Sequence, residues 1–462
     1  MSEAPVRGVA GHGIAAPRGQ EAAAGGRFGR LFGFLPAGDP GRKALEALIA
    51  LVERAKERAT ENELIPAGYT YLGQFIDHDI TFDPVSRLQR RSDPHALRNF
   101  RTPRFDLDSV YGSGPADQPF LYDWADPDGG VRMLIGGSAA VPDLPRNHAG
   151  RALLGDARND ENLLVAQLHL LMLRFHNRVV GFLREREEWP DRWDLFQEAQ
   201  RLVRWHYQWL VVHDYLERVA GWEMARSVRE PPGDLRWYQA QGDPAIPLEF
   251  SGAAFRFGHS MVRSDYLLTE SGKVVPLFER RGRDGHLGGF RPLPSELVVD
   301  WSFLFTAFPS MRIDRRLATP LRSLPPDRAS LPRLNLERGR ALGLPSGPDI
   351  ARAMGLEPLG ADDLLLDAEH ARTLSPETRA ALLRATPLWY YVLCEARSEW
   401  GRGGLQLGPL GGRIVAEVLV GLLAADPQSY VRQWPSWTPG QGGLPGITDD
   451  FTMADLVRFT DG

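Results

Sequence analysis

The chain reads GQFIDHDITFD from Gly73 to Asp83, a stretch with one imidazole, one amide and three carboxylates. If the stretch is helical, Gln74, Asp77 and His78 stand at i, i+3 and i+4 and share one face. Asp79 is turned by about 100° from His78 and must face a different neighbour. The stretch therefore predicts an acid–base group flanked by polar partners, with an anionic ligand pointing elsewhere. A solvated helix start, whose acids the helix dipole favours, is the alternative that this stretch leaves open.

The composition is that of an ordinary globular protein, since hydrophobic residues make up 43% and charged residues 24% of the 462 positions. This length is ample for a large core. The formal net charge of -5 gives no indication of nucleic-acid binding, which requires a basic surface. We expect a flexible arm over residues 1–26, which are rich in Ala and Gly, followed by a single domain over residues 27–462.

Cys394 is the only cysteine, so neither an intramolecular disulfide nor a thiolate metal cluster is expected. The first residues contain no apolar run of signal-peptide length. Nowhere do about eighteen apolar residues follow one another without interruption, so no membrane span is predicted. A cytoplasmic location is the default expectation, and a non-standard export route stays open.

Hydrophobic residues recur at helical spacing over much of the chain, whereas strand signals are few and no internal repeat is visible. The segments with this spacing are Gly41–Thr60, Asp156 to about Arg184, Trp193–Ala220, Phe250–Tyr266, Pro376–Arg397 and Gly411–Ala425. A Gly- and charge-rich segment, Gly272–Pro294, fits a hairpin insertion. The pattern predicts a mainly α fold with long loops.

A second polar stretch reads TPRFDLDSVYG from Thr102 to Gly112. Thr102, Asp106 and Asp108 alternate with other residues, which suits an extended loop whose oxygens converge on one point. Such a loop predicts a hard cation site.

Polar pairs with helical spacing also recur beside apolar residues. They are Gln74/Asp77/His78, Arg158/Glu161, Arg256/His259 and Asn335/Arg338. Buried charges are costly unless paired, so these groups are expected to meet one another or a shared polar ligand. A large apolar cofactor with anionic edges accommodates all of them. Haem fits this description, with one His as iron ligand, another as acid–base group and Arg for the propionates.

Five motifs, in order, are similar to those of the peroxidase–cyclooxygenase superfamily. The motifs are GQFIDHDITF, TPRFDLDSVYG, GDARNDENLL with LRFHNR, AFRFGHS, and LNLERGRALGLP. The sequence resembles the animal-type haem peroxidases that include myeloperoxidase, in the shorter form found in bacteria. The likeness covers roughly Pro66–Pro345, and the segment Leu407–Leu423 supports it further. It implies a single large helical haem-peroxidase domain.

On one side of haem b, the resemblance implies that His78 is the distal histidine, with Gln74 beside it. Arg158 is then the distal arginine. Asp77 and Glu161 match the two carboxylates that form esters with haem methyl groups in this family.

On the other side, the resemblance implies that His259 ligates the haem iron and that Asn335 holds its second ring nitrogen. Arg256 and Arg338 are then expected to reach the haem propionates.

A calcium site is implied beside the distal histidine. Its ligands are expected to be the carboxylates of Asp79, Asp106 and Asp108, the side chain and carbonyl of Thr102, and the carbonyl of Arg104. Three carboxylates with neutral oxygens suit Ca²⁺ better than Mg²⁺, which keeps more water.

The chain departs from the family pattern at several points. Asn162 stands where myeloperoxidase has a methionine, so a third link to haem is not expected. Asp108 replaces a serine of the animal enzymes. The ERGRALG segment lacks the usual Arg-Asp-His-Gly after Asn335, which leaves that region open.

The implied activity is that of a peroxidase. Hydrogen peroxide is reduced through a ferryl intermediate, and small organic donors or halide-like anions are oxidised.

A fatty-acid oxygenase of the same superfamily is a rival, but those members share a Tyr three residues before the proximal His, where this chain has Arg256. A haem-binding sensor or scaffold without turnover has no need of both His78 and Arg158. A metallohydrolase built on His78, Asp79 and Asp83 leaves the other motifs unexplained.

Two further histidine pairs have helical spacing without a third metal ligand. His169 and His176 lie seven residues apart, as do His206 and His213, and we expect all four to be structural.

Overall fold

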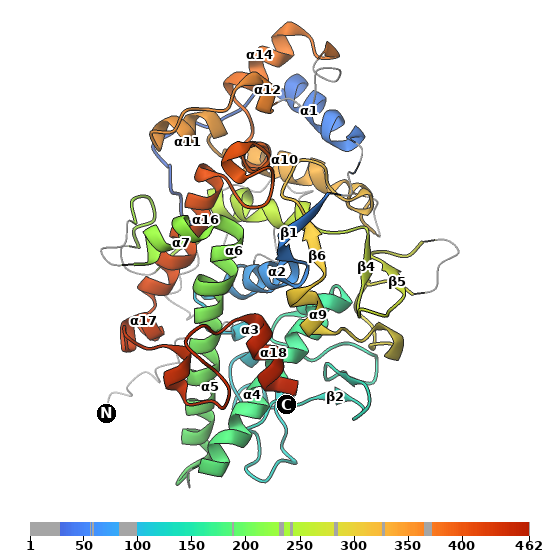
Figure 1. Ribbon diagram of the computed structural model, residues 1–462, viewed down its shortest axis with the longest axis vertical. Coiled ribbons are helices and arrows are strands. Elements are labelled where there is room, and N and C mark those ends of the chain that lie inside the picture. Colours follow the sequence, from blue (N-terminus) through green and yellow to red (C-terminus); the bar gives the residue numbers. More distant parts are fainter. Residues whose placement is uncertain are drawn as a thin grey trace, which may run out of the picture.

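The computed structural model describes residues 28–55, 57, 60–82, 99–186, 189–230, 235–240, 244–280, 285–325, 329–364 and 372–461 (Figure 1). The predicted arm over residues 1–26 and the carboxylate of Asp83 lie outside these residues.

The fold is mainly α, as the sequence predicts. Its α-helices are α1 (Arg42–Arg54), α2 (Gly68–Ile80), α3 (Asp108–Tyr111), α4 (Leu163–Arg186), α5 (Arg192–Trp209), α6 (Leu216–Ala220), α7 (Trp222–Arg229), α8 (Leu248–Gly252), α9 (Trp301–Thr306), α10 (Leu331–Ala341), α11 (Gly347–Ala353), α12 (Ala361–Leu364), α14 (Pro376–Arg384), α15 (Leu388–Arg397), α16 (Pro409–Ala425), α17 (Tyr430–Gln433) and α18 (Met453–Asp461). Among the described residues, no helix combines the length and hydropathy needed to cross a bilayer.

In the part of the chain that the structure describes, the strands are short and form three two-stranded antiparallel sheets. They pair β1 (Glu61–Pro66) with β6 (Pro309–Met311), β2 (Gly136–Gly137) with β3 (Pro142–Asp143), and β4 (Asp265–Leu267) with β5 (Val274–Pro276). The last pair is a hairpin that begins before the insertion predicted at Gly272–Pro294 and overlaps it only at β5.

Helix α2 lies in the middle of the molecule, surrounded by helices (Figure 1). Of its 13 residues, only Gln74 and Asp77 are not buried. The buried residues include His78 and Asp79, so the core must supply partners for these polar groups. The two exceptions share the face of His78, so the predicted polar face is the one part of α2 that packing leaves partly open.

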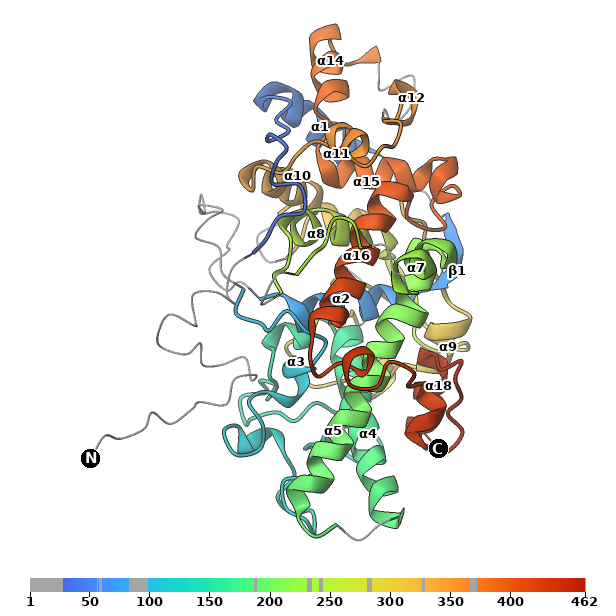
Figure 2. The ribbon, with the colours of Figure 1, turned by 90° about the vertical axis from the view of Figure 1, so that its left-hand side faces the viewer.

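Helices α4 and α5 form a long antiparallel pair at one end of the molecule, with α1 and α14 at the other (Figures 1 and 2). Helix α5 runs into α6 through a π-helical turn, Leu210–Tyr215. This turn brings the hydroxyl of Tyr215 so near α2 that a Cβ at Gly73 would lie 2.5 Å from it. Only glycine fits at that position.

The π-helical turn also anchors the C-terminal helix. The buried carboxylate of Asp214 accepts hydrogen bonds from the Tyr69 hydroxyl, at 2.9 and 2.7 Å, and from the backbone N–H of Met453, at 2.8 Å. Arg218 pairs with the same carboxylate at 2.7 Å. One carboxylate therefore connects α2, α6 and α18.

Two predicted helical segments are divided in the structure. Phe250–Tyr266 contains the end of α8 and a 3₁₀ helix, η6 (Ala254–Met261). Pro376–Arg397 is two helices, because Pro387 cannot donate the backbone hydrogen bond that a continuous helix requires; it is the N-cap residue of α15. The segment that begins at Asp156 starts as a 3₁₀ turn, η4 (Ala157–Asp160), before α4.

The buried histidine His206 offers a test of this packing. Its ring lies 5.2 Å from that of Trp437 and 5.1 Å from that of Phe451, and burial lowers its pKa from 6.5 to about 4. Between these pH values the unfolded chain binds a proton that the folded protein does not. Stability is therefore lost as the pH falls through this window.

We predict that His206→Phe, which keeps an aromatic ring among aromatic neighbours, removes this dependence. The free energy of unfolding, measured in urea at several pH values between about 7 and 4, should fall less steeply by up to about 1.4 kcal/mol per pH unit. His148→Phe, at an exposed position, is the control. Identical slopes in His206→Phe and the wild type contradict the prediction.

Candidate functional site

His78 lies in the last turn of α2 and is only 5% exposed. Its Nδ1 lies 2.8 Å from Oδ1 of Asn159, a residue of the turn η4. An amide oxygen only accepts, so Nδ1 carries the proton of this hydrogen bond. The neutral ring then has no proton on Nε2, which can act as a base. Asn159 in turn donates from Nδ2 to Nδ1 of His169, at 3.0 Å.

Arg158 is held against the C-terminal end of α2. Its Nη2 donates to the backbone carbonyls of His78, at 3.0 Å, and of Thr81. Asp156 pairs with the same guanidinium at 2.7 Å. Burial acts to raise the pKa of Asp156, but the hydrogen bonds and charge of Arg158, with the charge of Arg101, lower it below its ordinary value. The ring of Phe82 lies 4.9 Å from the guanidinium carbon of Arg158.

The half-buried side chain of Gln74 bonds to Glu161 and Asn162, which precede α4. Its Nε2 donates to Oε1 of Glu161, and its Oε1 accepts from Nδ2 of Asn162 at 3.1 Å. The other end of the Asn162 amide accepts from the backbone N–H groups at the start of α4. Glu161 is exposed and Asp77 half-buried, so both carboxylates border the open part of the polar face.

His259 and Asn335 approach each other from η6 and α10. Nδ2 of Asn335 lies 3.0 Å from Nδ1 of His259. Burial, together with the charges of Arg256 and Arg338, lowers the pKa of His259 to about 3. The imidazole is therefore neutral at neutral pH, as a metal ligand must be.

Electrostatic interactions connect the residues around His259 with those around His78. Burial lowers the pKa of Arg256. The charge of Asp77 raises this pKa and the charge of Arg158 lowers it. Helix η6 also packs directly against α2. The structure thus brings together the residues that the sequence analysis assigned to the two sides of a haem. Their individual roles stay predictions.

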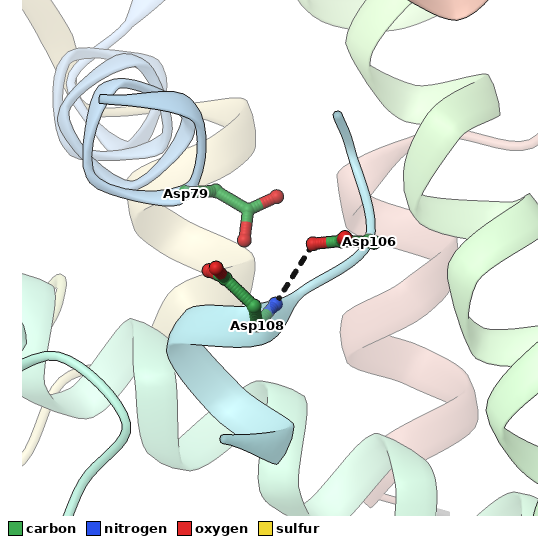
Figure 3. Close-up of side chains that lie close together, drawn as sticks. All are labelled: Asp79, Asp106 and Asp108. Carbon is green, nitrogen blue, oxygen red and sulfur yellow. Dashed lines mark hydrogen bonds between the residues drawn. The ribbon is translucent and has the colours of Figure 1, made fainter. Parts of the chain in front are cut away.

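The predicted cation site lies at Asp79, the residue that follows His78 in α2. Asp79, Asp106 and Asp108 are all buried, and each offers an oxygen within 4.8 Å of the others (Figure 3). Burial raises the pKa of Asp79 well above its ordinary value, and the charges of Asp108 and Asp106 raise it further. Burial and Asp106 raise the pKa of Asp108 to about 8. Three buried carboxylates in this arrangement favour a bound cation.

The loop of this site folds back on itself. Leu107 has a left-handed backbone, with φ 58°, so that the carboxylates on either side of it turn toward Asp79. Thr102 donates from its hydroxyl to Asp106 at 2.7 Å. Its carbonyl accepts from the backbone N–H of Arg104 at 2.8 Å. Four of the predicted ligand residues therefore lie close together in the sequence, opposite Asp79 of α2. The ligand roles of the Thr102 and Arg104 carbonyls stay predictions.

Sequence reasoning missed three residues of the site. Arg101 pairs with Asp108 at 3.0 Å and with Asp156 at 2.8 Å. Asn159 bonds to His78, and His169 bonds to Asn159. Arg101 and Asn159 each lie next to a predicted site residue in the sequence, which is the signal that was available. His169 was expected to be structural, and nothing in the local pattern links it to His78.

The sequence model of the animal haem peroxidase family matches residues 84–375. The chain is 29% identical over 300 residues to thyroid peroxidase of Sus scrofa, covering 58% of this chain and 31% of that protein. It is 30% identical over 226 residues to chorion peroxidase of Drosophila melanogaster, covering 46% of this chain and 28% of that protein. The chain thus spans about a third of the length of these curated relatives.

Solved structures share the fold. Peroxidase A from Dictyostelium discoideum superposes with a TM-score of 0.63 at 18% identity, over 94% of this chain and 93% of that chain. The fatty acid alpha-dioxygenase of Oryza sativa superposes with a TM-score of 0.64 at 16% identity, over 92% and 78%. At these identities the likeness shows the fold alone. The match of the family model over more than half of the chain decides the affiliation: this chain belongs to the animal haem peroxidase family.

Proposed function

We propose that this protein is a haem-dependent peroxidase that reduces hydrogen peroxide and oxidises small organic donors or halide-like anions. The observation that carries the proposal is the hydrogen bond from His78 Nδ1 to Asn159, which leaves a base beside Arg158. A protein that only bound haem would have no need of a base and a cation held together in this way.

The residues present fit haem b. The neutral imidazole of His259 suits an iron ligand, and Arg256 and Arg338 near it suit two propionates. When bound, haem supplies an iron centre that exchanges electrons with peroxide and donor. Ligation through Nε2 requires the proton of His259 to be on Nδ1, so Asn335 must present its oxygen. The amide in the structure presents its nitrogen. A half-turn about its last bond exchanges the two atoms.

His78 and Arg158 would do the work on the peroxide side. Nε2 of His78 takes the proton from peroxide and returns it to the departing oxygen, as general base and then general acid. The guanidinium of Arg158, fixed by Asp156 and by the end of α2, stabilises the negative charge that develops as the O–O bond breaks.

The fatty-acid oxygenase alternative finds less support. The oxygenases of the superfamily place a Tyr three residues before the proximal histidine, and this chain has Arg256 there. Its Nε donates to the backbone carbonyl of Ser251 at 2.8 Å. A guanidinium does not form the phenoxyl radical that hydrogen abstraction requires. The likeness to alpha-dioxygenases in fold does not alter this.

We predict that His78→Ala slows the reaction of the haem-loaded protein with hydrogen peroxide by about 10²- to 10⁴-fold, because the general base is lost. Stopped-flow absorbance of the Soret band measures the rate. His148→Ala, the same change at an exposed histidine, should leave it unchanged. A His78→Ala protein that reacts at the wild-type rate overturns the proposed function.

A calcium ion bound by Asp79, Asp106 and Asp108, with Thr102 and Arg104, would complete the site. Because Asp79 follows His78 directly, the ion would tie the end of α2 to the loop and hold the imidazole in place. Arg101 alone does not balance three carboxylates, since it also pairs with Asp156.

We predict that Asp79→Asn removes the bound calcium and lowers the thermal unfolding temperature. Elemental analysis of the purified protein measures the metal. A chelator should lower the unfolding temperature of the wild type and of Asp117→Asn, an exposed control, but should not affect Asp79→Asn. Equal calcium content in the wild type and Asp79→Asn refutes the site.

Ester links from Asp77 and Glu161 to haem are a further part of the proposal. Gln74 holds Glu161 and Thr81 donates to Asp77 at 3.2 Å, so each carboxylate has a fixed direction beside the open face. A link would remove the charge of both and anchor the cofactor.

We predict that haem added to haem-free protein is at first extractable with acid–butanone and resists extraction after exposure to peroxide. Mass spectrometry of the digest should find haem on peptides that contain Asp77 and Glu161. None is expected on Asn162, which has no thioether. The double variant Asp77→Asn, Glu161→Gln should keep its haem extractable. If wild-type haem also stays extractable, the two carboxylates only accept hydrogen bonds.

A further inference from the structure

Three buried side chains from three elements form a continuous chain of hydrogen bonds. It runs from His78 in α2 through Asn159 in η4 to His169 in α4. Their exposed fractions are 5%, 0% and 1%. The chain lies behind the catalytic imidazole, on the ring edge opposite Nε2. Bulk water therefore cannot substitute for any of its members.

We propose that Asn159 and His169 are positioning residues for His78. His169 sets the orientation of the Asn159 amide, and the amide then holds His78 in the tautomer whose Nε2 is free to accept a proton. This inference rests on the proposed function, in which His78 is the general base.

The amide has two orientations with opposite consequences. With its oxygen toward His78, as in the structure, the proton of the imidazole is on Nδ1 and Nε2 is bare. After a half-turn of the amide, its N–H group would face His78 Nδ1. That nitrogen would have to accept, and the proton would move to Nε2. A ring protonated at Nε2 cannot take a proton from peroxide, so the orientation of one amide decides whether the base works.

His169 selects between these orientations. Nδ1 of His169 accepts a hydrogen bond from Asn159 Nδ2 at 3.0 Å. This is possible only while Nδ1 of His169 carries no proton. Burial lowers the pKa of His169 to about 3, although the charge of Asp156 acts in the opposite direction. The ring is thus neutral at neutral pH and keeps one bare nitrogen. Phe75 packs against it with the ring planes at 69° and 6.1 Å between centroids, which fixes the plane of the imidazole.

His176 provides a matched control in the same helix. It lies seven residues further along α4, is equally buried, and has its pKa lowered to about 4 by burial. Its ring nitrogens lie 3.1 Å from the Tyr111 hydroxyl and 2.9 Å from the carbonyl oxygen of Val131. A substitution there disturbs a buried imidazole and its two hydrogen bonds without touching Asn159.

The test compares His169→Leu, Asn159→Leu, the double variant, His169→Gln and His176→Leu, all as haem-loaded proteins. Two rates are measured: the reaction with hydrogen peroxide, and the binding of cyanide, followed by the Soret shift. Cyanide enters as HCN and must lose its proton to a base, so its binding rate reports on His78 without turnover. Thermal unfolding of each variant measures the structural cost separately.

We expect His169→Leu and Asn159→Leu each to slow both reactions by about 10- to 100-fold, the usual effect of losing a residue that orients a catalytic group. The double variant should be no slower than the slower single variant, because both act through one hydrogen-bonded chain. His169→Gln, whose side-chain oxygen can accept from Asn159, should recover most of the rate. His176→Leu should lose stability but keep both rates within about twofold of the wild type.

Several results would overturn the inference: rates in His169→Leu equal to those in His176→Leu, additive losses in the double variant, or no recovery in His169→Gln. If His169→Leu does not fold, His169→Phe, which keeps a ring beside Phe75, takes its place with the same expectations. The proposed function fails separately, when His78→Ala itself reacts at the wild-type rate. A slow His78→Ala protein with an unaffected His169→Leu protein rejects the positioning role alone.

Discussion

The burial of α2 is the constraint on which the rest of this structure depends. A helix that is buried on nearly every face takes its polar groups into the core with it, and each of them then requires a partner. The partners come from segments distant in sequence. Asn159 serves His78, the Thr102–Asp108 loop surrounds Asp79, and Asp214 accepts from Tyr69. These contacts supply partners for the polar groups of α2 that are buried with it.

These contacts are joined by charge. A chain of ion pairs runs from Asp108 to Arg101, on to Asp156 and then to Arg158, with distances of 3.0, 2.8 and 2.7 Å. It connects the cation loop with the guanidinium beside His78. Breaking one buried pair leaves a charge without its partner, which costs far more than the pair contributes. These ion pairs thus join the Thr102–Asp108 loop to Arg158, in addition to the direct link along the chain from Asp79 to His78.

The described helices pack without any disulfide, since Cys394 is the sole cysteine of the chain. Buried carboxylates serve instead as cross-links between elements. Asp214 joins α2, α6 and α18, and Glu395 of α15 accepts from the backbone N–H groups of Leu410 and Gly411 at the start of α16. Each of these carboxylates satisfies backbone groups or hydroxyls that would otherwise be buried without a partner.

The sequence alone determined whatever depends on local geometry. Helical spacing placed Gln74, Asp77 and His78 on one face and turned Asp79 away, because these directions are intrinsic to an α-helix. The order of the motifs indicated the family, and the scarcity of strand signals indicated the mainly α fold. Tertiary structure decided the rest. Asn159 meets both His78 and His169, and Arg101 bridges Asp108 and Asp156, across segments whose relative placement no local pattern specifies. Side-chain partners of this kind follow from how whole helices pack, and that depends on the complete core.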